Sequence, residues 1–159
     1  MIKTDVICVG RLKEKYWSDA VSEYEKRLRS YTRLNIIELK DEKTPDGLNE
    51  NGCAEIMLTE ACRIREHLDD KALKIVLAIE GRQYSSEDFA AMLNDKMNAG
   101  ISHIQFIIGG SLGLHKSIKD GAFLLSFSKM TLPHQLMRVV LLEQIYRAHK
   151  ILRKEPYHK

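Results

Sequence analysis

The chain has few cysteines, and they stand in no recognisable pattern. Cys8, Cys53 and Cys62 are odd in number and show no C-x-x-C spacing, which excludes a disulfide framework and a cysteine-rich zinc site. The six histidines never stand at H-x-x-x-H spacing, so the sequence predicts no metal centre.

Long apolar runs are also lacking. No segment approaches the roughly 20 apolar residues of a membrane span, and the first residues do not form a basic and then apolar leader. We therefore expect a soluble, reduced, cytoplasmic protein with no membrane partner.

Charge of one sign is scarce too. The formal net charge is +3 over 159 residues, which by itself does not indicate a nucleic-acid-binding protein. Residues 38–70 hold ten acidic side chains against four basic ones, whereas residues 137–159 hold six basic against two acidic. We expect a polyanion to meet the basic carboxyl-terminal part, and scattered solvated charge is an equal alternative.

Apolar periodicity predicts strands that alternate with helices. We expect strands at 2–10, 34–39, 73–79, 104–108 and 123–128, and helices at 16–31, 54–68, 85–100 and 133–152. Residues 40–52 are polar and contain Pro45 and two glycines, which predicts a loop. The alternation is typical of an α/β fold, a parallel sheet flanked by helices. With no repeat or linker, we expect a single domain over 1–159.

The last predicted helix is apolar nearly all round, which indicates two apolar partners. One partner is the sheet, and we expect the other to be a second subunit in a homodimer. A charged residue in place of Leu142 or Ile145 would then weaken the dimer if either side chain faces outward.

Two strand exits lie close together in the last third of the chain. One strand runs into the turn Gly109–Gly113, and another runs into Ser128–Pro133. Exits of this kind predict a ligand site. The glycines match neither G-x-G-x-x-G nor G-K-[ST], so a plain glycine turn is an equal alternative. No G-x-S-x-G is present to indicate a serine nucleophile.

His134 follows Pro133 at the start of the last helix. The helix dipole disfavours a charged imidazole there, so His134 is expected to be neutral and able to accept a proton. A histidine that only bonds a neighbouring loop is the alternative. Arg138, one turn further on, is expected to hold a phosphate or a neighbouring carboxylate.

Tyr157, His158 and Lys159 follow Pro156, beyond any helix that they could stabilise. An aromatic ring, an imidazole and a cation in a row can stack on a base and hold a phosphate. We expect this tail to act on RNA and not on the fold, with a disordered terminus as the alternative.

Several segments together resemble one family. They are GRLKEKYW at 10–17, YEKRL at 24–28, IGGSLGLH at 108–115, LSFSKMTLPHQLMRVVLLEQIYRAHKI at 125–151 and the final YHK. They resemble the bacterial ribosomal RNA large-subunit methyltransferase H family of the SPOUT superfamily. The resemblance covers essentially the whole chain and is weakest at 40–72.

The resemblance implies a SPOUT fold with a trefoil knot in the carboxyl-terminal third, a homodimer, and S-adenosylmethionine as the cofactor. It maps the cofactor site onto Leu77, Gly109, Phe127, Ser128, Lys129, Met130, Thr131 and Leu132. The implied substrate is N3 of a pseudouridine in helix 69 of 23S ribosomal RNA (position 1915), in assembled ribosomes.

Methyl transfer from a sulfonium needs no metal, but the proton on N3 must leave. His134 and His158 are the candidate catalytic residues, and the resemblance does not choose between them. Arg138, Tyr157, His158 and Lys159 are the candidate RNA-binding residues. The alternative function is a non-catalytic ribosome-binding or assembly factor on the same fold.

Overall fold

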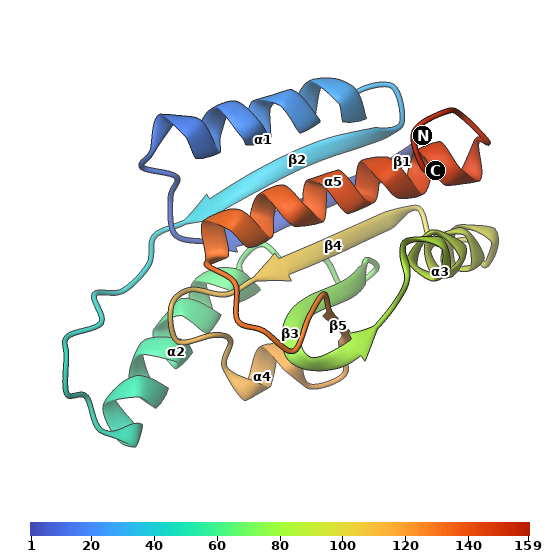
Figure 1. Cartoon of the computed structure of the whole chain (residues 1–159). Coiled ribbons are helices and arrows are strands. Elements are labelled where there is room, and N and C mark those ends of the chain that lie inside the picture. The colour runs from blue at the N-terminus through green and yellow to red at the C-terminus, as the bar shows by residue number, and fades with distance from the viewer.

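Five strands and five helices alternate along the chain, and the structure, a computed structural model, describes all residues from 1 to 159 (Figure 1). The elements are β1 (Ile2–Val9), α1 (Lys15–Leu28), β2 (Thr32–Leu39), α2 (Glu50–Arg65), β3 (Leu73–Gln83), α3 (Ser86–Asn98), β4 (His103–Ile108), α4 (Lys116–Lys119), β5 (Phe123–Ser126) and α5 (His134–Leu152). The expected order is confirmed. The sequence missed α4 because four residues are too few to show a helical period.

The strands form one sheet in the order β2-β1-β4-β3-β5, and every neighbouring pair is parallel. This confirms the predicted α/β class. In β1, Ile7 lies opposite Ile37 of β2 and Ile107 of β4. Because all strands run the same way, the loops that follow them gather at one edge of the sheet.

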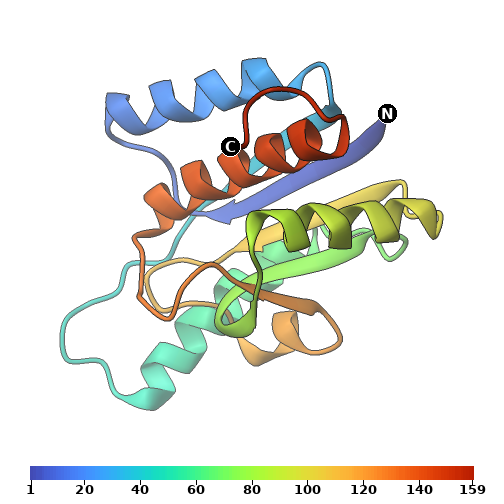
Figure 2. The same cartoon turned by 45° about the vertical axis from the view of Figure 1, so that its right-hand side comes forward.

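Helices cover both faces of the sheet. Helices α1, α3 and α5 lie on one face, and α2 and α4 lie on the other (Figures 1 and 2). Neighbouring residues of one strand pack into hydrophobic cores on opposite faces of the sheet. Phe106 packs in the cluster that includes residues of α5, and Ile107 packs in the cluster that includes residues of α2. All six residues of β4 are buried, and apart from His103 and Gln105 they are apolar, as expected for a strand covered on both faces. None of the helices combines the length and apolar character needed to span a membrane.

The pairing of β3 with β5 is interrupted. Leu77 and Arg82 both lie opposite Leu125, so residues 78–81 leave the ladder. A Cβ on Gly81 would lie 2.6 Å from the carbonyl carbon of Leu125, and only glycine allows so close an approach. Pairing resumes at Arg82, so β3 ends at Gln83, whereas the sequence predicted that it would end at residue 79. The trefoil knot stays a prediction.

A buried polar network closes the opposite edge of the sheet. Asp5 Oδ2 lies 2.7 Å from His103 Nε2 and accepts a hydrogen bond from Gln105 Nε2 at 3.2 Å. Burial alone would raise the pKa of Asp5, but the bonds from His103 and Gln105 and the charge of Lys3 lower it below its ordinary value. His103 thus stabilises the fold, far from the loops that follow the strands.

Candidate functional site

A cavity of about 790 Å³ lies at the edge of the sheet where the strands end. Three segments line it: the interruption of β3, the glycine turn after β4, and the loop from β5 into α5. The two strand exits identified in the sequence therefore meet at one cavity. Its size falls in the range of about 300–1,000 Å³ that is typical of small-molecule sites.

Seven of the eight predicted cofactor residues line this cavity: Leu77, Gly109, Phe127, Ser128, Met130, Thr131 and Leu132. Lys129 does not; it is exposed and lies outside the lining residues. The fold thus brings together residues up to 55 positions apart in sequence, as Leu77 and Leu132 are. Their part in binding a cofactor stays a prediction.

Gly109 has no room for a side chain. A Cβ there would lie 2.8 Å from the carbonyl carbon of Gly113 and 2.8 Å from Cγ of Leu114. The close contact is with the chain's own backbone. A larger residue at 109 would therefore distort the glycine turn even without a ligand. Gly113 has φ +82° with open space where a Cβ would lie, and this backbone conformation favours glycine.

The loop after β5 is fixed by its own hydroxyl groups. Ser126 Oγ donates to the carbonyl oxygen of Ser128 at 3.0 Å, and Ser128 Oγ accepts from the backbone N–H of Met130 at 3.0 Å. Met130 itself is 77 % exposed although it lines the cavity. The loop that lines this part of the cavity is thus held by two side-chain hydrogen bonds and carries an exposed apolar side chain.

The side chain of Glu60 packs against the glycine turn at Gly110, and the sequence analysis did not identify this residue. Its side chain is buried, and its Oε2 would lie 3.2 Å from a Cβ on Gly110. It accepts the backbone N–H of Glu42 at 3.1 Å. Burial raises the pKa of Glu60, against the opposing effect of that hydrogen bond. A carboxylate on a helical stripe gives no sign in the sequence that it faces inward.

His134 lines the cavity and begins α5, with Pro133 as the N-cap residue. Its ring lies against Gly10, whose Cβ, if present, would be 3.1 Å from Nε2. Burial, and then the nearby charge of Arg138, lower the pKa of His134 below 6.5, while Asp41 acts in the opposite direction. The imidazole is therefore neutral at neutral pH, as expected, with burial as the main cause.

Arg138 is buried, with only 1 % of its surface exposed. Its Nη1 contacts Glu38 Oε2 at 2.6 Å, and its Nη2 donates to the carbonyl oxygen of Gly10 at 3.1 Å. Of the two partners expected for Arg138, the structure shows the carboxylate. The prediction that Arg138 binds RNA is wrong for this chain, because its guanidinium is enclosed by protein.

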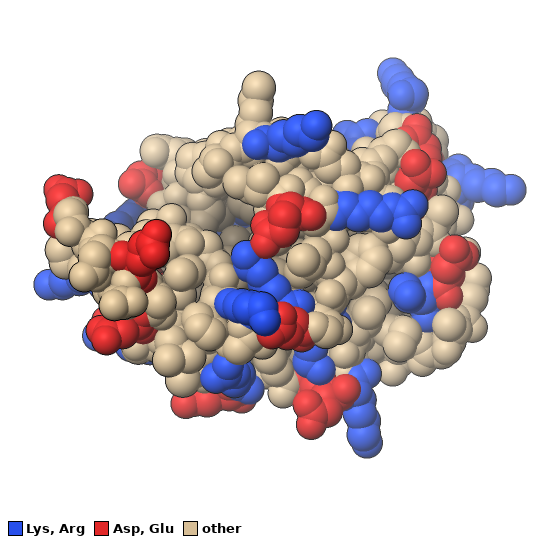
Figure 3. All heavy atoms as spheres, turned by 90° about the horizontal axis from the view of Figure 1, so that it is seen from below, with Lys and Arg blue, Asp and Glu red and all other residues tan.

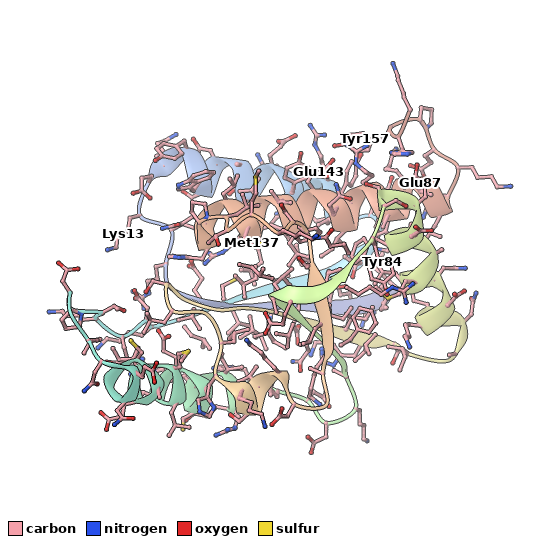
Figure 4. The ribbon with its side chains drawn as sticks, turned by 60° about the horizontal axis from the view of Figure 1, so that its bottom comes forward. Lys13, Tyr84, Glu87, Met137, Glu143 and Tyr157 are labelled. Atoms are coloured by element: carbon pink, nitrogen blue, oxygen red, sulfur yellow. The ribbon has the colours of Figure 1, made fainter.

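The last residues contact the rest of the fold, contrary to the expectation that they would not act on it. Tyr157 donates to Glu143 Oε1 at 3.1 Å, and its ring lies 4.9 Å from that of Tyr146. His158 Nε2 lies 2.6 Å from Glu87 Oε1 of α3. Figure 4 shows Tyr157, Glu143 and Glu87 near one another over the carboxyl-terminal half of α5. Neither Tyr157 nor His158 lines the cavity, so one chain does not bring His158 to His134.

Ion pairs neutralise much of the basic carboxyl-terminal part. Arg147 pairs with Glu143 at 2.6 Å, and Lys150 pairs with Glu155 at 2.6 Å. Acidic and basic side chains are interspersed on the face seen in Figure 3. Scattered solvated charge, the second of the two expectations, describes that face. No group of three or more His, Cys, Asp or Glu side chains is placed to hold a metal ion.

Known proteins are similar to this chain in sequence or in fold. A family model described as "Predicted SPOUT methyltransferase" matches residues 2–158. Two proteins named ribosomal RNA large subunit methyltransferase H are similar over 99 % of this chain and their full lengths, from Bifidobacterium adolescentis at 56 % identity and from Streptococcus uberis at 52 %.

A solved structure adds support for the fold alone. A probable methylase family protein from Haemophilus influenzae Rd KW20 superposes with a TM-score of 0.58 at 13 % identity, covering 100 % of this chain and 72 % of that one. Both the family model and the relatives extend over nearly all of the residues. The chain therefore belongs to the ribosomal RNA large subunit methyltransferase H family of SPOUT methyltransferases.

Proposed function

We propose that the protein transfers a methyl group from S-adenosylmethionine to large-subunit ribosomal RNA, at N3 of a pseudouridine in helix 69 of 23S RNA. The observation that carries the proposal is the cavity formed by the two strand exits, in a chain whose relatives are named for ribosomal RNA methylation. The proposed reaction needs a site for the methyl donor, a proton acceptor and a surface that binds RNA.

The cavity fits the cofactor that the family implies. Its walls combine apolar side chains such as Leu77 and Leu132 with the backbone of the glycine turn, which suits an adenosine group. Leu77, Gly109 and residues 127, 128 and 130–132 would hold it. When bound, the cofactor supplies an electrophilic methyl group for an in-line displacement, so the protein's main task is alignment.

His134 is the residue of this chain best placed to take the proton from N3. It lines the cavity, and its lowered pKa keeps the imidazole neutral. A neutral base near the acceptor removes a proton that would otherwise oppose transfer. His158 is bonded to Glu87 within its own chain, and it would reach a cavity only across a subunit boundary.

We propose a homodimer whose site is shared in that way. Helix α5 presents half-buried apolar residues, Leu136 and Val140, that are not among those packed against the core cluster beneath it. A second subunit would cover them. The dimer would then bring the tail of one subunit, with Tyr157 and His158, toward the cavity of the other.

Calorimetric titration with S-adenosylmethionine, with NAD and ATP as comparison ligands, tests the donor. We expect only the first to bind. Mass mapping of 23S RNA from a strain that lacks the gene then tests the acceptor, because the pseudouridine in helix 69 should lose one methyl group. Binding without any RNA methylation would favour a non-catalytic ribosome-binding protein.

A matched pair of variants tests the position of the cofactor. Ile79 lines the cavity and is 52 % exposed, while Leu58 lies on α2 away from the cavity and is 43 % exposed. Ile79→Ser should weaken S-adenosylmethionine binding by about tenfold, since the lost apolar contact is worth on the order of 1.5 kcal/mol. Leu58→Ser should bind as the wild type does; equal affinities for both variants would contradict the placement.

A further inference from the structure

We propose that the segment from Arg11 to Trp17, between β1 and the first turn of α1, is a docking surface for single-stranded RNA beside the cavity. The inference rests on the proposed function and adds the place where the substrate strand is held. Four observations support it: unpaired cations, an exposed aromatic ring, a backbone held by hydrogen bonds, and the contact of the preceding residue, Gly10, with His134, which lines the cavity.

The segment carries the largest positive excess among the loops at this edge of the sheet. Arg11, Lys13 and Lys15 stand against Glu14 alone. The loop after β2 holds more acidic than basic residues, the glycine turn holds no charged side chain, and the loop after β5 holds only Lys129. A polyanion approaching the cavity is therefore drawn to the segment after β1.

Two of these cations are free to bind a ligand. Arg11 and Lys13 are exposed, and neither has an ion-pair partner in the chain, whereas Lys15 pairs with Asp19 at 2.7 Å. Figure 4 shows Lys13 projecting away from the ribbon below the start of α1. By contrast, Arg138 and Arg147 are held by carboxylates. The cations available to phosphate therefore include this segment and not those two arginines of α5.

An exposed aromatic ring completes the surface. Tyr16 is 64 % exposed, and its ring centroid lies 5.1 Å from that of Trp17 at an interplanar angle of 59°. Unstacked bases of single-stranded RNA bind to aromatic faces while cations hold the neighbouring phosphates. This combination favours RNA over an acidic protein surface, which would use the cations but leave the ring without a base.

The backbone of the segment is fixed before any ligand arrives. The carbonyl oxygen of Gly10 accepts from Arg138 at 3.1 Å, and the N–H of Leu12 donates to Glu38 Oε2 at 3.2 Å. Arg138 and Glu38 are themselves paired at 2.6 Å. This brace ties the segment to the start of α5, so less order must be gained on binding.

The brace also sets the segment beside the reaction site. Gly10, the residue before Arg11, lies against the ring of His134, which lines the cavity. An RNA strand bound to Arg11 and Lys13 would thus enter the cavity next to His134. The surface would hold nucleotides that flank the one being methylated.

Charge reversal with a matched control tests the surface. The variant is Arg11→Glu with Lys13→Glu, and the control is Lys26→Glu with Arg29→Glu at the far end of α1, where both side chains are exposed and unpaired. The probes are ribosomes from a strain lacking the enzyme and isolated 23S RNA, with binding measured across a series of salt concentrations. S-adenosylmethionine affinity is measured separately by calorimetry.

We expect the variant to raise KM for ribosomes by about tenfold or more, with kcat and cofactor affinity near wild type. The salt slope of RNA binding should fall by about 0.7 for each lost phosphate contact. Tyr16→Ala should weaken RNA binding by about tenfold, and Tyr16→Phe should restore it because the ring is kept.

Three outcomes would overturn the proposal: variant and control lose affinity equally, the salt slope stays unchanged, or the loss occurs on ribosomes but not on isolated RNA. The last result would assign the surface to a ribosomal protein. If the wild-type protein neither binds S-adenosylmethionine nor methylates RNA, the proposed function fails, while the binding measurements still test the surface separately.

Discussion

His149 shows how the position of a single residue sets a pH dependence. Its ring is stacked on that of Tyr31 with centroids 5.5 Å apart. Burial, and then the charge of Arg153, lower the pKa of His149 from 6.5 to about 4. The folded protein therefore keeps this imidazole neutral at pH values where the unfolded chain already binds a proton.

We expect the free energy of unfolding to fall as pH drops from about 6.5 toward 4. The unfolded state binds more protons in that interval, so the contribution is fully present above 6.5 and is lost as pH falls through the folded pKa. The loss should be on the order of 3 kcal/mol, since each pKa unit corresponds to about 1.4 kcal/mol. Urea denaturation at several pH values measures it. His149→Phe keeps the stacking and should flatten the profile; an unchanged slope in that variant would contradict the assignment.

Gly109 is a residue whose importance the sequence showed and whose reason it did not. The family resemblance placed Gly109 in the cofactor site. The structure shows that a side chain at 109 would collide with Gly113 and Leu114 of the same turn. Substitutions at 109 therefore do not separate loss of cofactor binding from loss of the turn, and Ile79 is the better probe.

At the scale of elements, α5 is more fully covered by its own chain than its composition indicates. Leu142 and Ile145 are 0 % and 2 % exposed, so neither side chain faces outward, and the condition under which their substitution would report on a dimer is not met. Helices α1 and α3 flank α5 on the same face of the sheet (Figure 2). Leu136 and Val140, one turn apart, are half-buried and are not among the residues packed against the core cluster.

Val140→Asp should shift the protein from dimer toward monomer and leave the subunit folded. A buried carboxylate at a subunit interface is strongly unfavourable, whereas the same side chain on a monomer is solvated. Sedimentation at micromolar concentrations measures the change. Leu142→Asp is the matched contrast and should unfold the protein, because its side chain has no access to water. A wild-type protein that sediments as a monomer would remove the basis for the dimer.

At the scale of the whole molecule, the last residues connect α3 and α5. Tyr157 contacts Glu143, and His158 contacts Glu87, 71 positions away in sequence. These contacts replace the expectation that the tail would leave stability unchanged. The RNA role of the tail stays a prediction, now alongside a structural role.

Deleting residues 157–159 should lower the free energy of unfolding by about 1 kcal/mol, since it removes a partly exposed hydrogen bond and an aromatic contact. Thermal denaturation measures it, and deletion of Lys159 alone, which is exposed, is the control. Tyr157→Phe keeps the ring contact with Tyr146 and removes the bond to Glu143. If the three-residue deletion melts at the same temperature as the wild type, the tail does not contribute to the stability of the fold.

The sequence by itself determined the α/β class, the order of the elements and the two strand exits that form the cavity. Those features follow from local periodicity and from glycine and proline at element ends, which neighbouring residues are enough to specify. His134 was predicted to be neutral from its place at a helix start, and the structure agrees in direction.

Only the tertiary structure decided which partners the polar residues meet. Arg138 binds Glu38, 100 positions away, and Glu60 supports Gly110 from another helix. The interruption of β3 at 78–81 and the folding back of the tail also depend on contacts between distant segments. Burial and charge pairing arise from packing in three dimensions, and local sequence does not specify which distant side chain will fill a given space.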